Sequence, residues 1–154
     1  MSRTQRLLTV LAVALAAVGI TAAPAQAATA VVQFTYIQYD SPGSDTGTNA
    51  SINAEYVRVT NKSSFRVLMT GWTVRDAQSH VYTFQTGFSL PAGKTVTVHT
   101  GKGTNGYPTY WDRYQQRGWY VWNNTGDTAT LKSASGRIYD VCRWYSVGTG
   151  RTYC

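Results

Sequence analysis

The stretch LMTGWTVRD, at Leu68–Asp76, joins a strand-like run of apolar and β-branched residues to tight polar turns. A second stretch, WNNTGDTATL at Trp122–Leu131, has the same combination, with the turn residues placed before the strand. Asn, Asp and Gly favour turns, whereas alternating apolar and polar residues favour strands with one buried face. Both stretches therefore predict short β-strands, and we expect Trp72 to fill the space between two sheets.

Strand patterns of the same kind continue along most of the chain, and turn residues separate them. No amphipathic helical pattern follows the first segment. Short, closely spaced strands predict an all-β sandwich of about 7–9 mostly antiparallel strands. The expected strands are Val31–Tyr39, Ala54–Asn61, Phe65–Arg75, Val81–Phe84, Thr95–Thr100, Trp119–Trp122, Thr128–Lys132 and Arg137–Tyr145.

Alternation within two of these strands indicates which side chains point inward. Successive residues of a strand face opposite sides of the sheet, so the valines of Thr95–His99 share one face. The threonines of that segment share the other face with His99, and we expect this face to be solvated. In the segment Glu55–Val59, the two valines are in phase with Glu55. These valines are expected to pack in the core.

The two stretches quoted first, together with EYVRVTN at Glu55–Asn61, closely resemble the lamin-tail domain. This domain is an immunoglobulin-like β-sandwich that also occurs in secreted bacterial proteins. The resemblance covers about Val31–Tyr145 and implies a binding or structural module without a catalytic site. The chain has Arg58 where the family often carries an acidic residue, and Thr104–Gly118 is an insertion less typical of the family. The resemblance therefore implies a shared core but no shared surface.

The first 27 residues have the features of a secretory signal peptide. Arg3 and Arg6 give a positive start, Leu7–Ile20 is largely apolar, and Ala25–Ala27 supplies small residues for a peptidase. A membrane anchor is the alternative, but the apolar run is shorter than the roughly 20 residues that span a bilayer. We expect cleavage after Ala27 and a secreted, extracellular protein with no membrane span after cleavage.

Cleavage leaves residues 28–154, which are 127 of the 154 residues and suit a single domain with one core. The full chain has 14 Lys and Arg and 7 Asp and Glu, so the mature chain, without Arg3 and Arg6, keeps 12 basic residues and a formal charge of +5. This mild excess is compatible with attraction to anionic polymers such as nucleic acid or cell-wall polyanions. An ordinary secreted domain that carries this charge for solubility is the favoured explanation.

Both cysteines, Cys142 and Cys154, lie near the C-terminus of a chain that is expected to be exported. Outside the cytosol such a pair persists as a disulfide, which would hold the C-terminal tail to the last strand. A covalent dimer through Cys154 is the alternative. Metal binding is not expected, because neither cysteine has a second ligand at metal-site spacing.

The sequence predicts no catalytic residues, no cofactor and no metal ion. His80 and His99 lie in or beside strands, Glu55 is the only glutamate, and the six aspartates are scattered. Hydrolases need a nucleophile with a base, paired carboxylates or a metal, and no local motif supplies these. The GxGxxG pattern at Gly101–Gly106 lacks the helix that phosphate binding requires. Asp40–Asp45 is expected to be a turn and not a calcium loop.

The best candidate for function is the insertion and the strand after it. Seven aromatic residues lie between Tyr107 and Trp122, with arginines among them. Loops at the end of a β-sandwich commonly carry binding surfaces, and aromatic rings with Arg can hold sugars, bases or phosphates. Packing of these rings against the core or an edge strand is the alternative. The candidate binding surface comprises Lys102, Tyr110, Trp111, Arg113, Tyr114, Arg117 and Trp119.

The sequence thus favours a secreted, non-catalytic binding module for a polysaccharide, a cell-wall polymer or extracellular nucleic acid. The alternative is a structural or protein-interaction module, a monomer or a weak dimer, in which the same aromatic residues cover a protein interface. An enzyme that acts on nucleic acid is the least favoured class, because the sequence offers it no reactive group.

Overall fold

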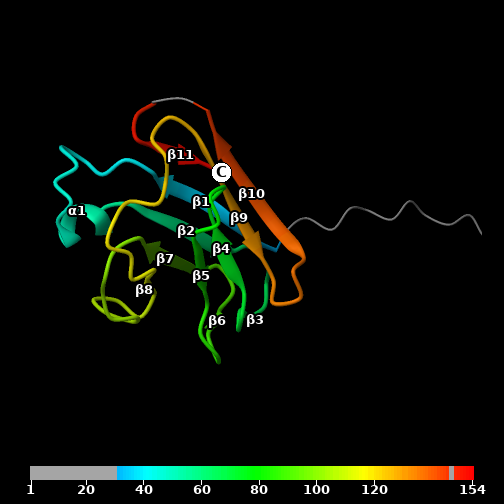
Figure 1. Ribbon diagram of the computed structural model, residues 1–154. Coiled ribbons are helices and arrows are strands. Elements are labelled where there is room, and N and C mark those ends of the chain that lie inside the picture. The colour runs from blue at the N-terminus through cyan, green and yellow to red at the C-terminus, as the bar shows by residue number, and fades with distance from the viewer. Residues whose placement is uncertain (1–30, 146–147) are drawn as a thin grey trace, which may run out of the picture.

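The computed structural model describes residues 31–145 and 148–154 (Figure 1). The expected signal peptide, residues 1–27, lies outside the described residues. Within the described ranges, no helix is long and apolar enough to cross a membrane. In chain order the elements are β1 (Val32–Gln38), α1 (Asn49–Asn53), β2 (Tyr56–Asn61), β3 (Val67–Leu68), β4 (Thr73–Arg75), β5 (Val81–Thr83), β6 (Ser89–Leu90), β7 (Thr95–His99), β8 (Asp112–Tyr114), β9 (Asp127–Lys132), β10 (Ile138–Trp144) and β11 (Arg151–Tyr153).

The strands form two main sheets and one small pair. The larger sheet has the order β11-β1-β2-β7-β8, the second sheet has the order β10-β9-β4-β5, and β3 pairs with β6. All pairs are antiparallel except β7 with β8, which is parallel. The all-β, immunoglobulin-like sandwich is confirmed (Figure 1).

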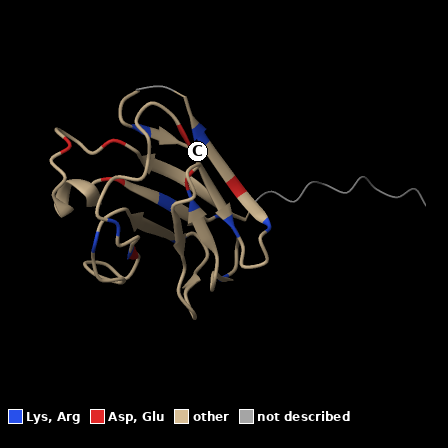
Figure 2. Ribbon diagram, in the orientation of Figure 1, with Lys and Arg blue, Asp and Glu red and all other residues tan. Residues whose placement is uncertain are grey.

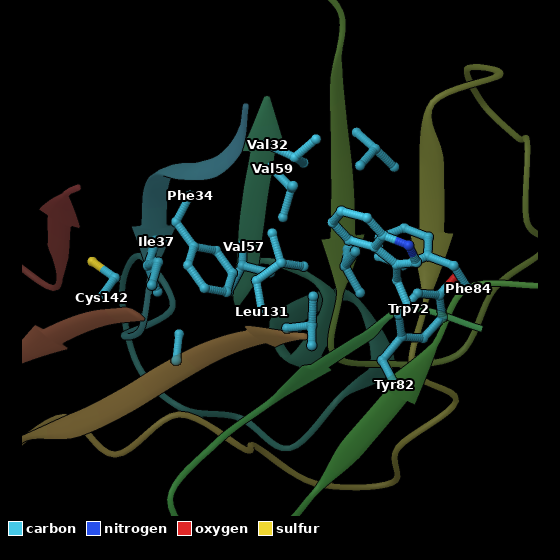
Figure 3. Close-up of a cluster of buried hydrophobic side chains, with 14 of the residues drawn as sticks. Val32, Phe34, Ile37, Val57, Val59, Trp72, Tyr82, Phe84, Leu131 and Cys142 are labelled. Atoms are coloured by element: carbon cyan, nitrogen blue, oxygen red, sulfur yellow. The ribbon is translucent and has the colours of Figure 1, made fainter. Parts of the chain in front are cut away.

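The core lies between the two main sheets. Val57 and Val59 of β2 and Val96 and Val98 of β7 are fully buried, as their alternation predicted. Figure 3 shows the β2 valines beside Phe34 and Ile37 of β1, with Leu131 of β9 opposite them. Side chains from both sheets therefore interdigitate in one apolar layer.

Trp72 occupies the second part of this core. Its side chain is 6% exposed, and its ring centroid lies 4.1 Å from that of Tyr139. Figure 3 places it beside Tyr82 and Phe84. The expectation that Trp72 fills the space between sheets is confirmed.

The expected strand Phe65–Arg75 is two strands, which is a correction to the sequence analysis. The chain turns at Thr70–Gly71, and Gly71 has φ +72, a left-handed conformation that glycine adopts without strain. The Gly71 N–H donates to the carbonyl oxygen of Phe84 at 2.9 Å. As a result β3 pairs with β6, whereas β4 joins the second main sheet. This division contributes to a count of eleven strands in the described residues, above the expected range.

The expected strand Trp119–Trp122 is absent, because a buried carboxylate takes the place of a neighbouring strand. Glu55 is fully buried, and its two carboxylate oxygens accept hydrogen bonds from the N–H groups of Val121 at 3.0 Å and Trp122 at 2.9 Å. Backbone donors inside a protein need partners, and here a side chain supplies them. The segment 119–122 is thereby fixed without strand pairing.

The short helix α1 was also not expected. It has five residues, which is too short to give a helical hydrophobic pattern. Thr48 caps it, since its side-chain oxygen accepts a hydrogen bond from the N–H of Ser51 at 3.3 Å. Ile52 is its buried residue and fixes α1 against the domain.

Cys142 and Cys154 form an intramolecular disulfide, with 5.7 Å between their Cα atoms. Cys142 lies in β10 of one sheet, and Cys154 directly follows β11 of the other. The bond therefore holds the C-terminal strand against the edge of β1 (Figure 1).

Candidate binding groove on the five-stranded sheet

Polar and aromatic side chains form rows across the outer face of the five-stranded sheet, which is the face opposite the core. Strand register places Tyr153, Tyr36, Arg58, Thr97 and Asp112 next to one another, each from a different strand. Neighbouring side chains on one face of a sheet are close enough to contact. Five strands that are distant in sequence therefore contribute to one surface.

This surface is hollowed into a groove with a volume of about 570 Å³. The volume falls within the ~300–1,000 Å³ that is usual for small-ligand sites. Aromatic rings, hydroxyl groups, one guanidinium and one carboxylate line it. The lining residues are Thr35, Tyr36, Arg58, Thr95, Thr97, Thr109, Trp111, Asp112 and Tyr153.

Arg58 lies at the centre of the groove and contacts two tyrosine rings. Its guanidinium carbon lies 5.3 Å from the ring centroid of Tyr36 and 5.2 Å from that of Tyr56. The two rings stack with their centroids 5.7 Å apart. A cation over aromatic faces is attracted by the ring quadrupole, so these rings hold the exposed guanidinium in place. Within the described residues it makes no ion pair.

Tyr36 links the centre of the groove to its wall. Its ring meets that of Tyr153 edge to face, with the centroids 5.2 Å apart. Its hydroxyl group donates to Oε1 of Gln38 at 2.6 Å. Partial burial, together with the neighbouring Tyr56, raises the pKa of Tyr36, so the hydroxyl stays protonated at neutral pH and keeps donating.

Asp112 supplies a fixed negative charge on the side of Arg58 that faces away from Tyr36 along the row. Its Oδ2 accepts hydrogen bonds from the N–H of Thr109 at 2.9 Å and from the Thr109 hydroxyl at 2.7 Å, and its Oδ1 contacts Nε2 of His99 at 3.1 Å. Burial disfavours the charged form, but these hydrogen bonds outweigh burial and lower the pKa of Asp112 below its usual value. Asp112 is therefore ionised at neutral pH and accepts hydrogen bonds.

His99 is not solvated, which corrects the expectation for this face. Its side chain is 19% exposed, and its Nδ1 contacts the carbonyl oxygen of Asn53 at 2.8 Å. The ring of Tyr114 stacks on it, with the centroids 5.1 Å apart. The insertion covers this end of β7 because β8 pairs with β7 and carries Tyr114 over His99. His99 orients Asp112 and does not meet solvent freely.

The structure distributes the sequence-predicted surface over three places. Trp111 lines the groove and packs partly against the core. Tyr110 is 64% exposed, and its ring is perpendicular to that of Trp111. Tyr114 stacks on His99 and donates its hydroxyl proton to the carbonyl oxygen of Tyr107 at 2.9 Å. These rings are not coplanar, so they form no flat platform.

The other predicted residues lie near the short helix or inside the protein. Lys102 and Arg117 line a second, smaller pocket, and Trp119 is 65% exposed beside it. Arg113 is only 3% exposed, so its assignment to the surface is wrong. Its guanidinium donates to the carbonyl oxygens of Tyr110 and Asp112 and lies 4.4 Å from the ring centroid of Phe88, so Arg113 stabilises the insertion from within.

The residues at the centre of the groove are not among those predicted from the sequence: Tyr36, Arg58 and Tyr153. Alternation is a clear signal only for Arg58, because its neighbours Val57 and Val59 in β2 are buried. In β1 an irregularity between Phe34 and Tyr36 leaves both Thr35 and Tyr36 partly exposed, and Tyr153 lies in a strand of only three residues. Alternation also does not show which strands are neighbours.

The His and carboxylate side chains of the described residues form two pairs and no larger metal-binding group. None of the His, Cys, Asp and Glu side chains in this part of the chain form a group of three that would hold a metal ion. The two His–carboxylate contacts, His80 with Asp76 and His99 with Asp112, lie within turns and strand pairs. The groove can offer hydrogen bonds and ring faces, which is binding chemistry.

Two sheets around an aliphatic and tryptophan core, with a groove on one outer face, define an immunoglobulin-like sandwich module. The family model described as Lamin Tail Domain matches residues 25–146, and the chain belongs to this family. The family consists of non-catalytic immunoglobulin-like domains. No curated protein matches the chain.

Proposed function

We propose that this protein is a secreted, non-catalytic module that binds a neutral polysaccharide in the groove of the five-stranded sheet. One observation carries the proposal: the groove combines aromatic rings with a hydrogen-bond donor, Arg58, and a hydrogen-bond acceptor, Asp112, along one row of side chains. An extracellular site, as the sequence predicts, would expose this groove to polymers outside the cell.

Sugar hydroxyl groups both donate and accept hydrogen bonds, and the C–H faces of a sugar ring are apolar. Arg58 donates and does not accept, whereas ionised Asp112 accepts and does not donate. Tyr36, Trp111 and Tyr153 offer rings on which apolar C–H faces bury area. The groove therefore matches a ligand with both properties.

The same groove is poorly suited to nucleic acid. The ionised carboxylate of Asp112 would repel a phosphate backbone that followed the row to Arg58. The basic residues of the described chain are also spread over many elements (Figure 2). A basic stripe is the usual electrostatic footprint of a nucleic-acid site. A neutral polymer avoids the repulsion.

A pull-down against a panel of insoluble neutral polysaccharides tests the proposal. We expect the wild-type protein to bind at least one of them. Arg58→Ala should weaken this binding by about tenfold or more, since a charged hydrogen bond contributes roughly 1.5–3 kcal/mol. Arg143→Ala is the matched control, because Arg143 is an exposed strand arginine of the other sheet. Binding to none of the panel, or equal binding by Arg58→Ala, would refute the proposal.

A protein-interaction role is the second candidate, and the exposed rings of the insertion favour it. Tyr107, Tyr110 and Trp119 are 70%, 64% and 65% exposed. Large exposed rings are enriched where proteins associate. Sedimentation over a range of concentrations tests self-association: a dimer that dissociates in the Tyr110→Ala variant would support this role, and a strict monomer would exclude its self-association form.

A further inference from the structure

A second pocket lies between the short helix and the loops on either side of β8, and it differs from the groove in charge. Its volume is about 220 Å³, below the ~300–1,000 Å³ of drug-sized sites, so it has room for one small cyclic group. We call it the basic pocket. The residues that line it are Gly47, Asn49, Ile52, Lys102, Arg117 and Gly118.

The backbone of Lys102 is held rigidly at the rim of this pocket. Its N–H donates to Oδ1 of Asn49 at 2.8 Å, and its carbonyl oxygen accepts from Nδ2 of Asn49 at 3.0 Å and of Asn53 at 2.8 Å. A Cβ on the preceding Gly101 would approach the Asn53 and Asn49 oxygens to 2.6 and 2.8 Å, so only glycine permits this clamp. The side chain of Lys102 itself is exposed and makes no hydrogen bond within the described residues.

Arg117 supplies the second positive charge. Its N–H donates to the carbonyl oxygen of Thr100 at 3.0 Å, which fixes its backbone. One guanidinium nitrogen, Nη2, makes a long hydrogen bond of 3.3 Å to the carbonyl oxygen of Val81, and Nε is buried without a partner. Nη1 makes no hydrogen bond within the described residues and is not buried, so it remains available as a donor.

Neither cation is neutralised by the protein. Within the part of the chain that the structure describes, no carboxylate oxygen lies within 4.0 Å of the side-chain nitrogens of Lys102 or Arg117. Two unpaired cations on fixed backbones create a site that favours an anion, and Arg is suited to a planar carboxylate. The groove of the five-stranded sheet has no such pair of cations.

Trp119 lies beside the basic pocket, next to two of the residues that line it, Gly47 and Gly118. Its ring lies against Gly47, where an added Cβ would approach it to 2.8 Å. The next residue, Tyr120, holds this segment to the helix, because its hydroxyl contacts the Ser51 hydroxyl at 2.6 Å and the N–H of Gly47 at 3.3 Å. The ring of Trp119 is nevertheless 65% exposed. It is held beside the pocket, and most of its surface is exposed.

We propose that the basic pocket binds a sugar residue that carries a carboxylate, such as a uronic acid unit of an acidic polysaccharide. The carboxylate lies between Lys102 and Arg117, and the sugar ring packs on Trp119. A free inorganic anion would pair with the two cations but would have no ring to pack on Trp119. This site is separate from the groove, and the inference does not rest on the proposed function.

Calorimetric titration of the secreted protein with a uronic acid oligomer tests the proposal. We expect saturable binding that Lys102→Gln and Arg117→Gln each weaken by about tenfold, since each removes a charge-assisted hydrogen bond. Lys94→Gln is the matched control, because Lys94 is exposed in a turn outside both sites, and it should bind as the wild type does. The side chain of Lys102 is exposed, so its removal leaves the fold intact.

Three further measurements sharpen the test. Trp119→Ala should weaken binding of the oligomer without changing the weak binding of inorganic phosphate, which separates a sugar site from a simple anion site. Arg58→Ala should leave oligomer binding unchanged, so a failure of the groove proposal and a failure of this one are distinguishable. Absence of oligomer binding, equal binding by Lys102→Gln, or equal affinity for phosphate would overturn the proposal.

Discussion

At the scale of single residues, the buried carboxylate of Glu55 links the charge state of the protein to its stability. Burial raises the pKa of Glu55 to about 7, although the N–H groups of Val121 and Trp122 favour the ionised form and offset part of the rise. In the unfolded chain the group has its usual pKa near 4.5. Between these two values the folded protein retains a proton that the unfolded chain has lost.

The free energy of unfolding is therefore expected to fall as the pH rises from about 4.5 to about 7. A shift of this size corresponds to about 3 kcal/mol at most. Glu55→Gln does not titrate, so its unfolding free energy should lose this contribution to the pH slope. Urea denaturation of both proteins at several pH values provides the measurement. Parallel pH profiles for the two proteins would contradict the prediction.

Arg113 carries a positive charge into the interior, and we expect it to be a stability residue. Arg113→Met removes the donor to the carbonyl oxygens of Tyr110 and Asp112, which are 2.8 and 2.7 Å away. The Asp112 carbonyl keeps its hydrogen bond from the Gly106 N–H at 2.8 Å, but the Tyr110 carbonyl loses its donor, which should lower the free energy of unfolding by about 1–3 kcal/mol. Arg113→Lys should also destabilise, because an ammonium lacks the planar fork.

Denaturant unfolding followed by tryptophan fluorescence measures this effect. Arg143→Ala serves as the reference, because Arg143 is exposed. Surface substitutions change the free energy of unfolding by less than about 0.5 kcal/mol. A change as small as this in Arg113→Met would show that the fold does not need the buried guanidinium.

At the scale of elements, β11 connects the disulfide to the groove. The bond closes a loop with a sequence separation of 12, and β11 places Tyr153 against Tyr36 in the groove wall. In the double variant Cys142→Ser, Cys154→Ser, the unfolded chain gains conformational entropy, so the free energy of unfolding should fall by about 3 kcal/mol. The variant should also bind polysaccharide less tightly, because β11 is no longer held.

Tyr153→Ala separates the two effects. Its ring lines the groove, so its loss should weaken polysaccharide binding. Because the ring is 75% exposed, the melting temperature should stay close to that of the wild type. Thermal melts and pull-downs of both variants give the comparison. Full polysaccharide binding by the double cysteine variant would show that the disulfide is not needed to hold β11 in the groove wall.

Alternation within a strand made the core predictable, whereas pairing between strands made the site unpredictable. Val96 and Val98 could be assigned inward because the period of a strand is a local property. The proximity of Arg58 to Asp112 depends on the parallel pairing of β7 with β8, which no local pattern indicates. The aromatic content of the insertion was correctly seen as unusual. Its division between a groove wall, the interior and the basic pocket follows from tertiary contacts.

At the scale of the whole molecule, the two proposed sites respond differently to salt. Binding in the groove relies on ring contacts and hydrogen bonds to neutral groups, so it should change little between about 0.05 and 1 M salt. Binding in the basic pocket relies on two cations and should weaken about tenfold or more over the same range. Titrations of a neutral and an acidic oligosaccharide against one protein preparation provide the comparison. Equal salt dependence for both ligands would mean that a single site binds them.

The position of β11 also has a consequence for the solubility of the protein. Without β11, the backbone N–H and C=O groups of β1 along Tyr36–Gln38 would lie unpaired at a sheet edge. Unpaired edges are templates for strand addition from other molecules, and short or covered edges suppress it. A three-residue strand tied down by a covalent bond is a compact cover of this kind. Chains that end before Arg151, and so lack both β11 and the disulfide, would therefore be the ones to assemble into fibrils or precipitate.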